Sequence, residues 1–175
     1  KSLGYQGFLY YGQYINTNPS KYEKISKVIP ETIISPGKLY VKLRKEFCKN
    51  LNIQVGPALY FQDMFKKYDK KKSIEILLIL SGVKYLDSRL INLTAHFLRK
   101  NKNVKLVIKT HPILPRSKIN NKNLELLKNQ IIFSDEKLSL LLQKTKISIC
   151  SGPTSGTIES ISYNCFLIIP IMEPY

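Results

Sequence analysis

From residue 74 onward, the sequence alternates between short apolar runs and longer amphipathic segments. Each run has the length of a buried β-strand, and each longer segment has room for a helix. Strands that alternate with helices form a parallel sheet with helices on both faces. The apolar runs are residues 74–80, 104–108, 131–133, 147–150 and 166–169. The sequence therefore predicts an α/β, Rossmann-like, doubly wound parallel sheet, with ligands beyond the carboxyl ends of its strands.

The segments between these runs are expected to be helical. Residues 87–100 carry apolar side chains at helical spacing, which predicts that one face of this helix is buried. That face consists of Leu86, Leu90, Leu93 and Phe97. Two other expected helices are residues 124–127 and residues 157–164. A further helix is expected after Ser134, which would cap it. Asp135 and Glu136 would lie in its first turn, and Leu138, Leu141 and Leu142 would face inward.

Residues 1–72 have a different character, rich in aromatic residues, glycine and proline. Their short apolar runs predict strands at residues 8–11, 32–34 and 53–55, and residues 39–47 predict a helix. A charged linker is expected at residues 65–72. The sequence thus predicts two parts, residues 1–72 and residues 73–175. Residue 1 is Lys rather than Met, so we expect a fragment of a longer protein.

The charge is strongly positive. In 175 residues, 28 Lys and Arg stand against 12 Asp and Glu, a net charge of +16. Such a balance is typical of modules that bind nucleic acid or an anionic membrane surface. Only four of the cations are arginines, and the positive residues are spread over both parts, which disfavours specific nucleic-acid recognition. Most of the charge is interpreted as lysine-rich surface, suited to an anionic membrane surface.

Composition narrows the possibilities further. A hydrophobic content of 43% with 9 Pro and 8 Gly excludes a disordered or collagen-like chain. No apolar run is long enough to span a bilayer. Three cysteines lack metal-binding spacing, their odd number argues against a disulfide framework, and two histidines cannot build a multi-histidine site. We therefore expect no metal and no cofactor.

The most informative motif follows the run at residues 147–150. A loop of small hydroxyl residues and glycines leads directly into a helix, so free N–H groups and a positive helix end would face an anion. Its candidate residues are Ser151, Gly152, Thr154, Ser155, Gly156 and Thr157. The alternative is ordinary capping of the helix by Ser155. Glu159, expected in the first helical turn, is not explained by capping and can accept hydrogen bonds from a ribose diol.

Two further candidate segments follow other strands. Lys109, His111 and Pro112 come after the run at residues 104–108, with Arg116 nearby. The proline ends the strand, so the imidazole would project from the strand tip, where it can donate to a phosphate. Ser81 and Gly82 follow the first run, where a glycine lets a phosphate approach the backbone. No Ser-His-Asp triad or Cys-His dyad can be recognised in the sequence, so no catalytic residue is assigned.

In combination, the His-Pro segment and the later Ser/Thr segment resemble the carboxyl-terminal half of a GT-B glycosyltransferase. The likeness is greatest to bacterial families with a His-Pro motif, such as sialyltransferases and Kdo transferases. The resemblance implies that His111 and the Ser/Thr loop hold the nucleotide of a sugar donor, commonly CMP, and that Glu159 binds the ribose. Residues 4–7 and 55–59 resemble the end of the amino-terminal lobe and the interlobe crossing.

The resemblance implies a glycosyltransferase of bacterial surface-polysaccharide synthesis, such as lipopolysaccharide or capsule. Its partners would be a nucleotide sugar and a glycan or lipid-linked acceptor, in the cytoplasm and peripheral on the inner membrane. The acidic triplet that carries the general base in sialyltransferases is missing, so the fragment is expected to be inactive alone. Alternatives are a UDP-sugar 2-epimerase or a CDP-glycerol glycerophosphotransferase on the same fold, and a basic nucleic-acid or membrane-surface module.

Overall fold

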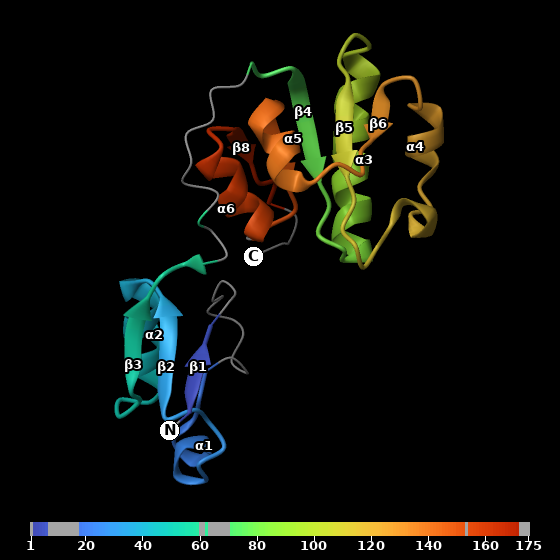
Figure 1. Cartoon of the computed structure of the whole chain (residues 1–175). Coiled ribbons are helices and arrows are strands. Elements are labelled where there is room, and N and C mark those ends of the chain that lie inside the picture. Colours follow the sequence, from blue (N-terminus) through green and yellow to red (C-terminus); the bar gives the residue numbers. More distant parts are fainter. Residues whose placement is uncertain (1, 7–17, 60–61, 63–70, 153, 172–175) are drawn as a thin grey trace. The chain divides into compact units, whose positions relative to one another are not determined.

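The computed structural model describes residues 2–6, 18–59, 62, 71–152 and 154–171 (Figure 1). The chain divides into two compact units, residues 1–66 and 67–175, which are considered separately below. The strand expected at residues 8–11 lies outside the described residues, as does most of the expected linker at 65–72.

In its described residues, the first unit is a small parallel sheet with two α-helices. Its strand order is β1-β2-β3, and both neighbouring pairs are parallel. Cys48 and Leu51 pack with two isoleucines of β2 and β3 in its core. The strands are β1 (Leu3–Tyr5), β2 (Thr32–Pro36) and β3 (Ile53–Gly56), and the helices are α1 (Lys21–Ile25) and α2 (Lys38–Phe47). The assignment of this part to an amino-terminal lobe stays a prediction.

A buried polar group lies at the carboxyl ends of β1 and β2. The amide oxygen of Gln6 accepts hydrogen bonds from the Ser35 hydroxyl at 3.1 Å and from Arg44 Nε at 3.0 Å. Arg44 is only 4% exposed. One of the four arginines is therefore part of the interior of this unit and adds nothing to its basic surface.

The second unit is the predicted five-stranded parallel sheet, with strand order β6-β5-β4-β7-β8. All four neighbouring pairs are parallel, so the expected fold class is confirmed. The chain begins in the central strand β4, builds β5 and β6 on one side, and then crosses to β7 and β8 on the other. The strands are β4 (Ile74–Ile79), β5 (Leu106–Lys109), β6 (Ile131–Phe133), β7 (Thr145–Cys150) and β8 (Phe166–Ile168).

Helices cover both faces of this sheet (Figure 1). α3 (Lys84–Lys100) packs against the face of β4 that carries Ile76 and Leu78. α5 (Leu138–Lys144) and α6 (Ser155–Ser162) contact β4 and β7, and at the other face Gly156 of α6 lies against Ile79. The alternation of side chains along β4 therefore separates two apolar layers.

The buried face of α3 differs from the prediction. Leu90 is buried as expected, but Leu93 is 52% and Phe97 is 45% exposed. The buried positions beside Leu90 include Thr94 and Ala95, which a search for large apolar residues passes over. The Thr94 hydroxyl donates to the Leu90 and Ile91 carbonyls, so its burial leaves no polar atom unpaired.

The starts of α3, α4 (Lys122–Leu126), α5 and α6 also differ from the prediction. α4 begins after Asn121, whose side-chain oxygen accepts from the N–H of Asn123 at 3.0 Å. α5 begins after Lys137, and Ser134 is not its cap. The Ser134 hydroxyl instead accepts from the Glu136 N–H at 3.3 Å, which forms a local turn before the helix.

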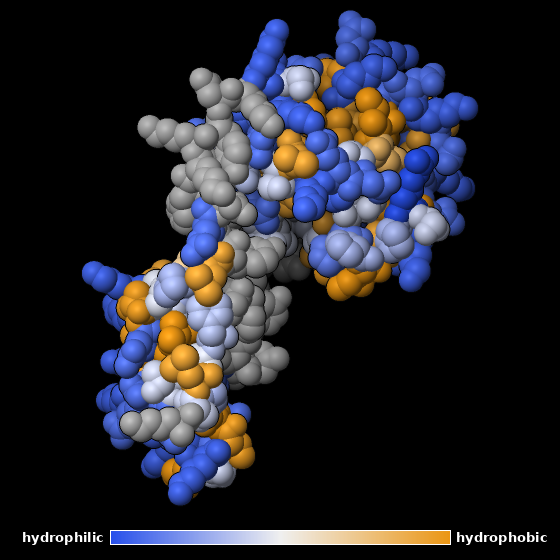
Figure 2. All heavy atoms as spheres, in the orientation of Figure 1, coloured by the Kyte–Doolittle hydropathy of each residue, from blue (hydrophilic) through white to orange (hydrophobic). Residues whose placement is uncertain are grey.

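The surface of the second unit is mixed. In Figure 2, hydrophilic residues cover much of its visible face, with hydrophobic residues between them. Exposed apolar side chains include Ile161 of α6 and Phe166 of the edge strand β8. Within the described part of the chain, no helix combines the length and the apolar character that a membrane crossing requires.

Candidate functional site

Three predicted segments meet at one edge of the second sheet. Ile79, near the end of β4, pairs with Lys109 of β5 on one side and with Cys150 of β7 on the other. Adjacent strands lie about 4.8 Å apart. The segments that begin at Ser81, His111 and Ser151 therefore leave the sheet from one row. This row includes the point between β4 and β7 where the chain changes direction, at which α/β folds bind their ligands.

The N-terminus of α6 lies at this edge. Its N-cap is Thr154 rather than Ser155. The Thr154 N–H donates to the Gly152 carbonyl at 2.9 Å and contacts Thr157 Oγ1 at 3.3 Å. The next two N–H groups, of Ser155 and Gly156, have no acceptor among the described residues. Two donors and the positive helix end are thus available to an anion.

The close packing of this helix end depends on a glycine. A Cβ on Gly156 would lie 3.2 Å from Ile79 Cγ2 and 3.6 Å from a Leu138 methyl group. Gly152 is different, because a Cβ there would have no heavy atom within 4 Å. One glycine brings the helix onto the sheet, and the other faces open space.

Two serine hydroxyls of this region are buried without a hydrogen-bond partner in the described structure. Ser148 is fully buried within β7, and Ser151 is 8% exposed directly after it. An unsatisfied buried hydroxyl costs about 1–3 kcal/mol. Ser151 precedes the free N–H groups of Ser155 and Gly156 by four and five residues, so a bound ligand would explain why its hydroxyl is buried without a partner. Ser148 lies inside a strand, where the same explanation does not apply.

His111 is held against Gly82. Gly82 has φ +85, and a Cβ on it would lie 2.7 Å from His111 Nδ1. The same Nδ1 accepts a hydrogen bond from the N–H of Ile113 at 3.2 Å. This hydrogen bond places the proton of a neutral imidazole on Nε2, which is then a donor. The glycine supplies both the turn and the space for the ring.

The backbone donors of Ser81 and Gly82 are engaged by Asp87, a residue that sequence reasoning missed. Its carboxylate accepts from the Ser81 N–H at 2.7 Å and from the Gly82 N–H at 2.9 Å. Asp87 is 1% exposed. The sequence offered one signal for this role: Asp87 is an acidic residue on the apolar face of the expected helix, next to Leu86 and near Leu90. Contact of Ser81 and Gly82 with a nucleotide stays a prediction.

The remaining predicted residues lie at different depths. Lys109 is half-buried and its carbonyl accepts from the Leu80 N–H, while Pro112 is exposed. Glu159 is half-buried in the second turn of α6 rather than the first. Burial raises the pKa of the Glu159 carboxyl above its ordinary value.

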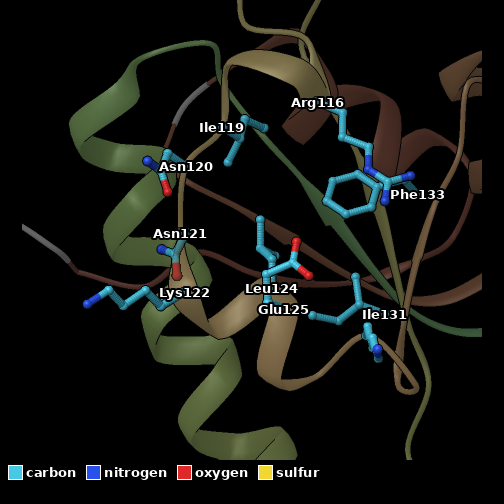
Figure 3. Close-up of a pocket in the computed structure, with 10 residues that line it drawn as sticks. Arg116, Ile119, Asn120, Asn121, Lys122, Leu124, Glu125, Ile131 and Phe133 are labelled. Atoms are coloured by element: carbon cyan, nitrogen blue, oxygen red, sulfur yellow. The ribbon is translucent and has the colours of Figure 1, made fainter.

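Arg116 lies beside a separate hollow. It belongs to η3 (Arg116–Lys118), and its guanidinium stacks over the Phe133 ring at 4.5 Å. Both line a cavity of about 360 Å³ between η3, α4 and β6 (Figure 3). Ile119, Leu124 and Ile131 contribute apolar wall, and Glu125 also lines the cavity. The ring contact makes Arg116 part of the wall of this hollow.

Metal ligands do not gather at this edge. Across the described ranges, no group of three or more His, Cys, Asp or Glu side chains could hold a metal ion. The donors at the strand ends are N–H groups, hydroxyls and an imidazole. Such donors are suited to the oxygens of a phosphate.

Solved structures that resemble this chain include three complexes. Pneumococcal O-GlcNAc transferase GtfA, with UDP and GlcNAc, has a TM-score of 0.60 and 12% identity over 97% of this chain. A mutant of S. aureus TarM, with fondaparinux, α-GlcNAc-glycerol and UDP, has a TM-score of 0.56 and 14% identity over 94%. A GtfA/B complex has a TM-score of 0.54 and 12% identity over 86%. The fold is that of GT-B glycosyltransferases.

The GT-B assignment is limited to the fold. The chain spans 38%, 36% and 33% of the length of GtfA, TarM and the GtfA/B chain, respectively. No family model and no curated protein matches the sequence. The expected GT-B fold is confirmed, while membership of the sialyltransferase or Kdo transferase families stays a prediction.

Proposed function

We propose that this chain is the nucleotide-sugar-binding part of a glycosyltransferase. The buried, unpartnered Ser151 hydroxyl carries the proposal, because it belongs to the loop that leads from β7 to the free N–H groups of Ser155 and Gly156 at the start of α6. A phosphate oxygen would satisfy all of these donors together. GtfA and TarM, which share the GT-B fold, are in complex with UDP, and this supports a nucleotide as the ligand of this chain.

The site supports a division of roles. The α6 N-terminus and Ser151 would hold the phosphate of the donor, and His111 would donate from Nε2 to a phosphate oxygen. Glu159 would accept hydrogen bonds from the ribose hydroxyls. Charge that develops on the leaving nucleotide would meet fixed dipoles and hydrogen-bond donors, which is the usual form of electrostatic stabilisation. The acceptor and the general base would come from elsewhere in the full enzyme.

The finer identity of the donor belongs to the same proposal. The resemblance to the His-Pro families implies CMP, and the neighbouring complexes make UDP the nucleotide to compare with it. We further propose that the enzyme acts in bacterial surface-polysaccharide synthesis, on a glycan or lipid-linked acceptor at the inner membrane. The lysine-rich surface is suited to that anionic membrane.

Removing the Ser151 hydroxyl tests the proposal. Ser151→Ala is expected to weaken CMP binding by about ten- to a hundredfold, since a hydrogen bond to a charged group is worth ~1.5–3 kcal/mol. Ser148→Ala is the matched control, with an equally buried hydroxyl inside the strand. It is expected to raise the free energy of unfolding by about 1 kcal/mol and to leave binding unchanged. Isothermal titration with CMP and UDP, and urea unfolding, measure both effects.

The outcomes separate the competing functions. Binding of CMP or UDP that depends on Ser151 but not on Ser148 supports the proposal. Equal losses in both variants would attribute the effect to the strand rather than to the site. Absence of binding to either nucleotide, together with tight DNA or vesicle binding that falls steeply with salt, would establish the basic-module alternative.

Glu159→Gln is expected to change stability and binding in opposite directions. Because burial raises the pKa of Glu159, the folded state loses stability as pH rises from the unfolded pKa through the higher folded pKa. The variant should therefore match the wild type near pH 4 and be more stable at pH 7. Nucleotide binding should weaken about tenfold at pH 7, because a carboxylate accepts more strongly from a ribose diol than an amide does.

Thermal melts from pH 4 to pH 8 and titrations at pH 7 measure these effects. Glu125→Gln is the control, an exposed carboxyl on α4. A Glu159→Gln protein that binds nucleotide as well as the wild type would remove Glu159 from the ribose site.

A further inference from the structure

Asp87 is unusually buried for an acid in the first turn of an amphipathic helix. It is 1% exposed, although a carboxylate at a helix N-terminus gains from the dipole without being buried. Its two oxygens accept three hydrogen bonds from the preceding turn. Oδ1 accepts from the Ser81 N–H at 2.7 Å and the Ser81 hydroxyl at 2.9 Å, and Oδ2 accepts from the Gly82 N–H at 2.9 Å.

These contacts fix the backbone between β4 and α3. The Ser81 hydroxyl also accepts from the Val83 N–H at 3.2 Å, so the side chain of Ser81 links Asp87 to the residue before the helix. Gly82 is held at φ +85 within this turn. The three hydrogen bonds offset the desolvation of the buried carboxylate, and together they hold one backbone conformation of the turn.

The fixed turn forms the wall for the His111 ring. The position of a Gly82 Cβ is 2.7 Å from His111 Nδ1 and 2.9 Å from Cγ, so the ring lies flush against the glycine backbone. On the ring, Nδ1 accepts from the Ile113 N–H. The Gly82 backbone and the hydrogen bond from the Ile113 N–H together set the direction in which His111 Nε2 points.

We propose that Asp87 is a positioning residue for His111. Through the Ser81–Gly82 turn, it holds the imidazole with Nδ1 on the Ile113 N–H and with the Nε2 proton directed to the donor phosphate. The proposal rests on the proposed function for the contact between His111 and phosphate. Asp87 itself touches no ligand, since its carboxylate is occupied by the turn. Its loss releases the turn and lets the ring move between orientations.

The ring nitrogens of His111 report this effect directly. The chain has only two histidines, and His96 is exposed on α3, so it is an internal reference. In the full chain at pH 8, ¹⁵N spectra should show one His111 form, with Nδ1 as acceptor and Nε2 protonated. Asp87→Asn should move both His111 nitrogens toward an average of the two tautomers and leave His96 unchanged. Asp135→Asn, an exposed acid after β6, is the matched control.

Two further variants keep the test decisive. Gly82→Ala should displace His111 with Asp87 intact, because its Cβ would overlap the ring, and should give the same spectral change. Ser81→Ala removes one of the three hydrogen bonds and should give a smaller change in the same direction. It stands in for Asp87→Asn if that protein does not fold by circular dichroism. His111 signals identical to wild type in a folded Asp87→Asn or Ser81→Ala protein would overturn the proposal.

Nucleotide binding is measured separately. Affinity for CMP should fall about tenfold in Asp87→Asn and should not change in Asp135→Asn. The ring signals are recorded without nucleotide, so they test Asp87 even if no nucleotide binds. Ring signals that move in a protein that binds no nucleotide would sustain the positioning role and reject the proposed function. Nucleotide binding that depends on His111, with ring signals unmoved in Asp87→Asn, would support the proposed function and reject the positioning role of Asp87.

Discussion

Gly152→Asp should lower affinity for CMP or UDP by about a hundredfold and leave the protein folded. A Cβ at Gly152 meets nothing within 4 Å, so the backbone accepts a side chain there. The new carboxylate would lie near the start of α6 and repel a phosphate bound at its free N–H groups. A carboxylate and a phosphate ~5.5 Å apart repel by about 3 kcal/mol at an effective dielectric constant of ~20. This repulsion corresponds to a roughly hundredfold loss of nucleotide affinity.

Gly152→Ala is the matched control for this charge, because it adds the same Cβ without the carboxylate. It should bind nucleotide within about threefold of the wild type, as measured by isothermal titration. The melting temperature of Gly152→Asp should equal or exceed that of the wild type, because an acid near a helix N-terminus is favourable. Undiminished nucleotide affinity in Gly152→Asp would place the phosphate somewhere else.

Lys72→Met should lower the free energy of unfolding by about 2 kcal/mol. Lys72 is half-buried, and its ammonium donates to the carbonyl of Tyr163 at 2.7 Å and to that of Leu142 at 3.2 Å. These carbonyls lie at the C-terminal ends of α6 and α5, where a cation is favourable. Methionine keeps the apolar stem but cannot donate, so both carbonyls lose this partner.

For a unit of this size, a loss of that magnitude corresponds to a melting temperature lower by roughly 8–16 °C. Lys71→Met is the control, since it removes an exposed lysine from the preceding position. It should change the melting temperature by less than about 2 °C. Equal stability of the two variants in calorimetry would show that the helix ends do not depend on Lys72.

Lys72 also marks a limit of local sequence reasoning. It falls in a lysine-rich stretch whose composition is typical of a solvated linker, and its neighbour Lys71 is indeed exposed. Its two carbonyl partners lie 70 and 91 residues further along the chain. Charge density along the sequence cannot distinguish these two lysines, because their difference arises only when α5 and α6 end at the same place.

The exposed face of α3 has a similar origin. Leu93 and Phe97 have the spacing of a buried stripe with Leu90, but the sheet contacts a face rotated toward Ile91, Ala95 and Leu98. Helical periodicity shows that one side is more apolar. The neighbouring element decides which part of that side it covers.

Sequence by itself determined the parallel five-stranded sheet and the strand ends at which Ser81, His111 and Ser151 lie, because strand length and alternation with helices are local properties. Only the tertiary structure decided what each of these residues does there. It buried the Ser151 hydroxyl without a partner, closed the Ser81 turn onto Asp87, and set His111 against Gly82. Burial and hydrogen bonding depend on atoms that come from distant parts of the chain, and no spacing along the sequence records those contacts.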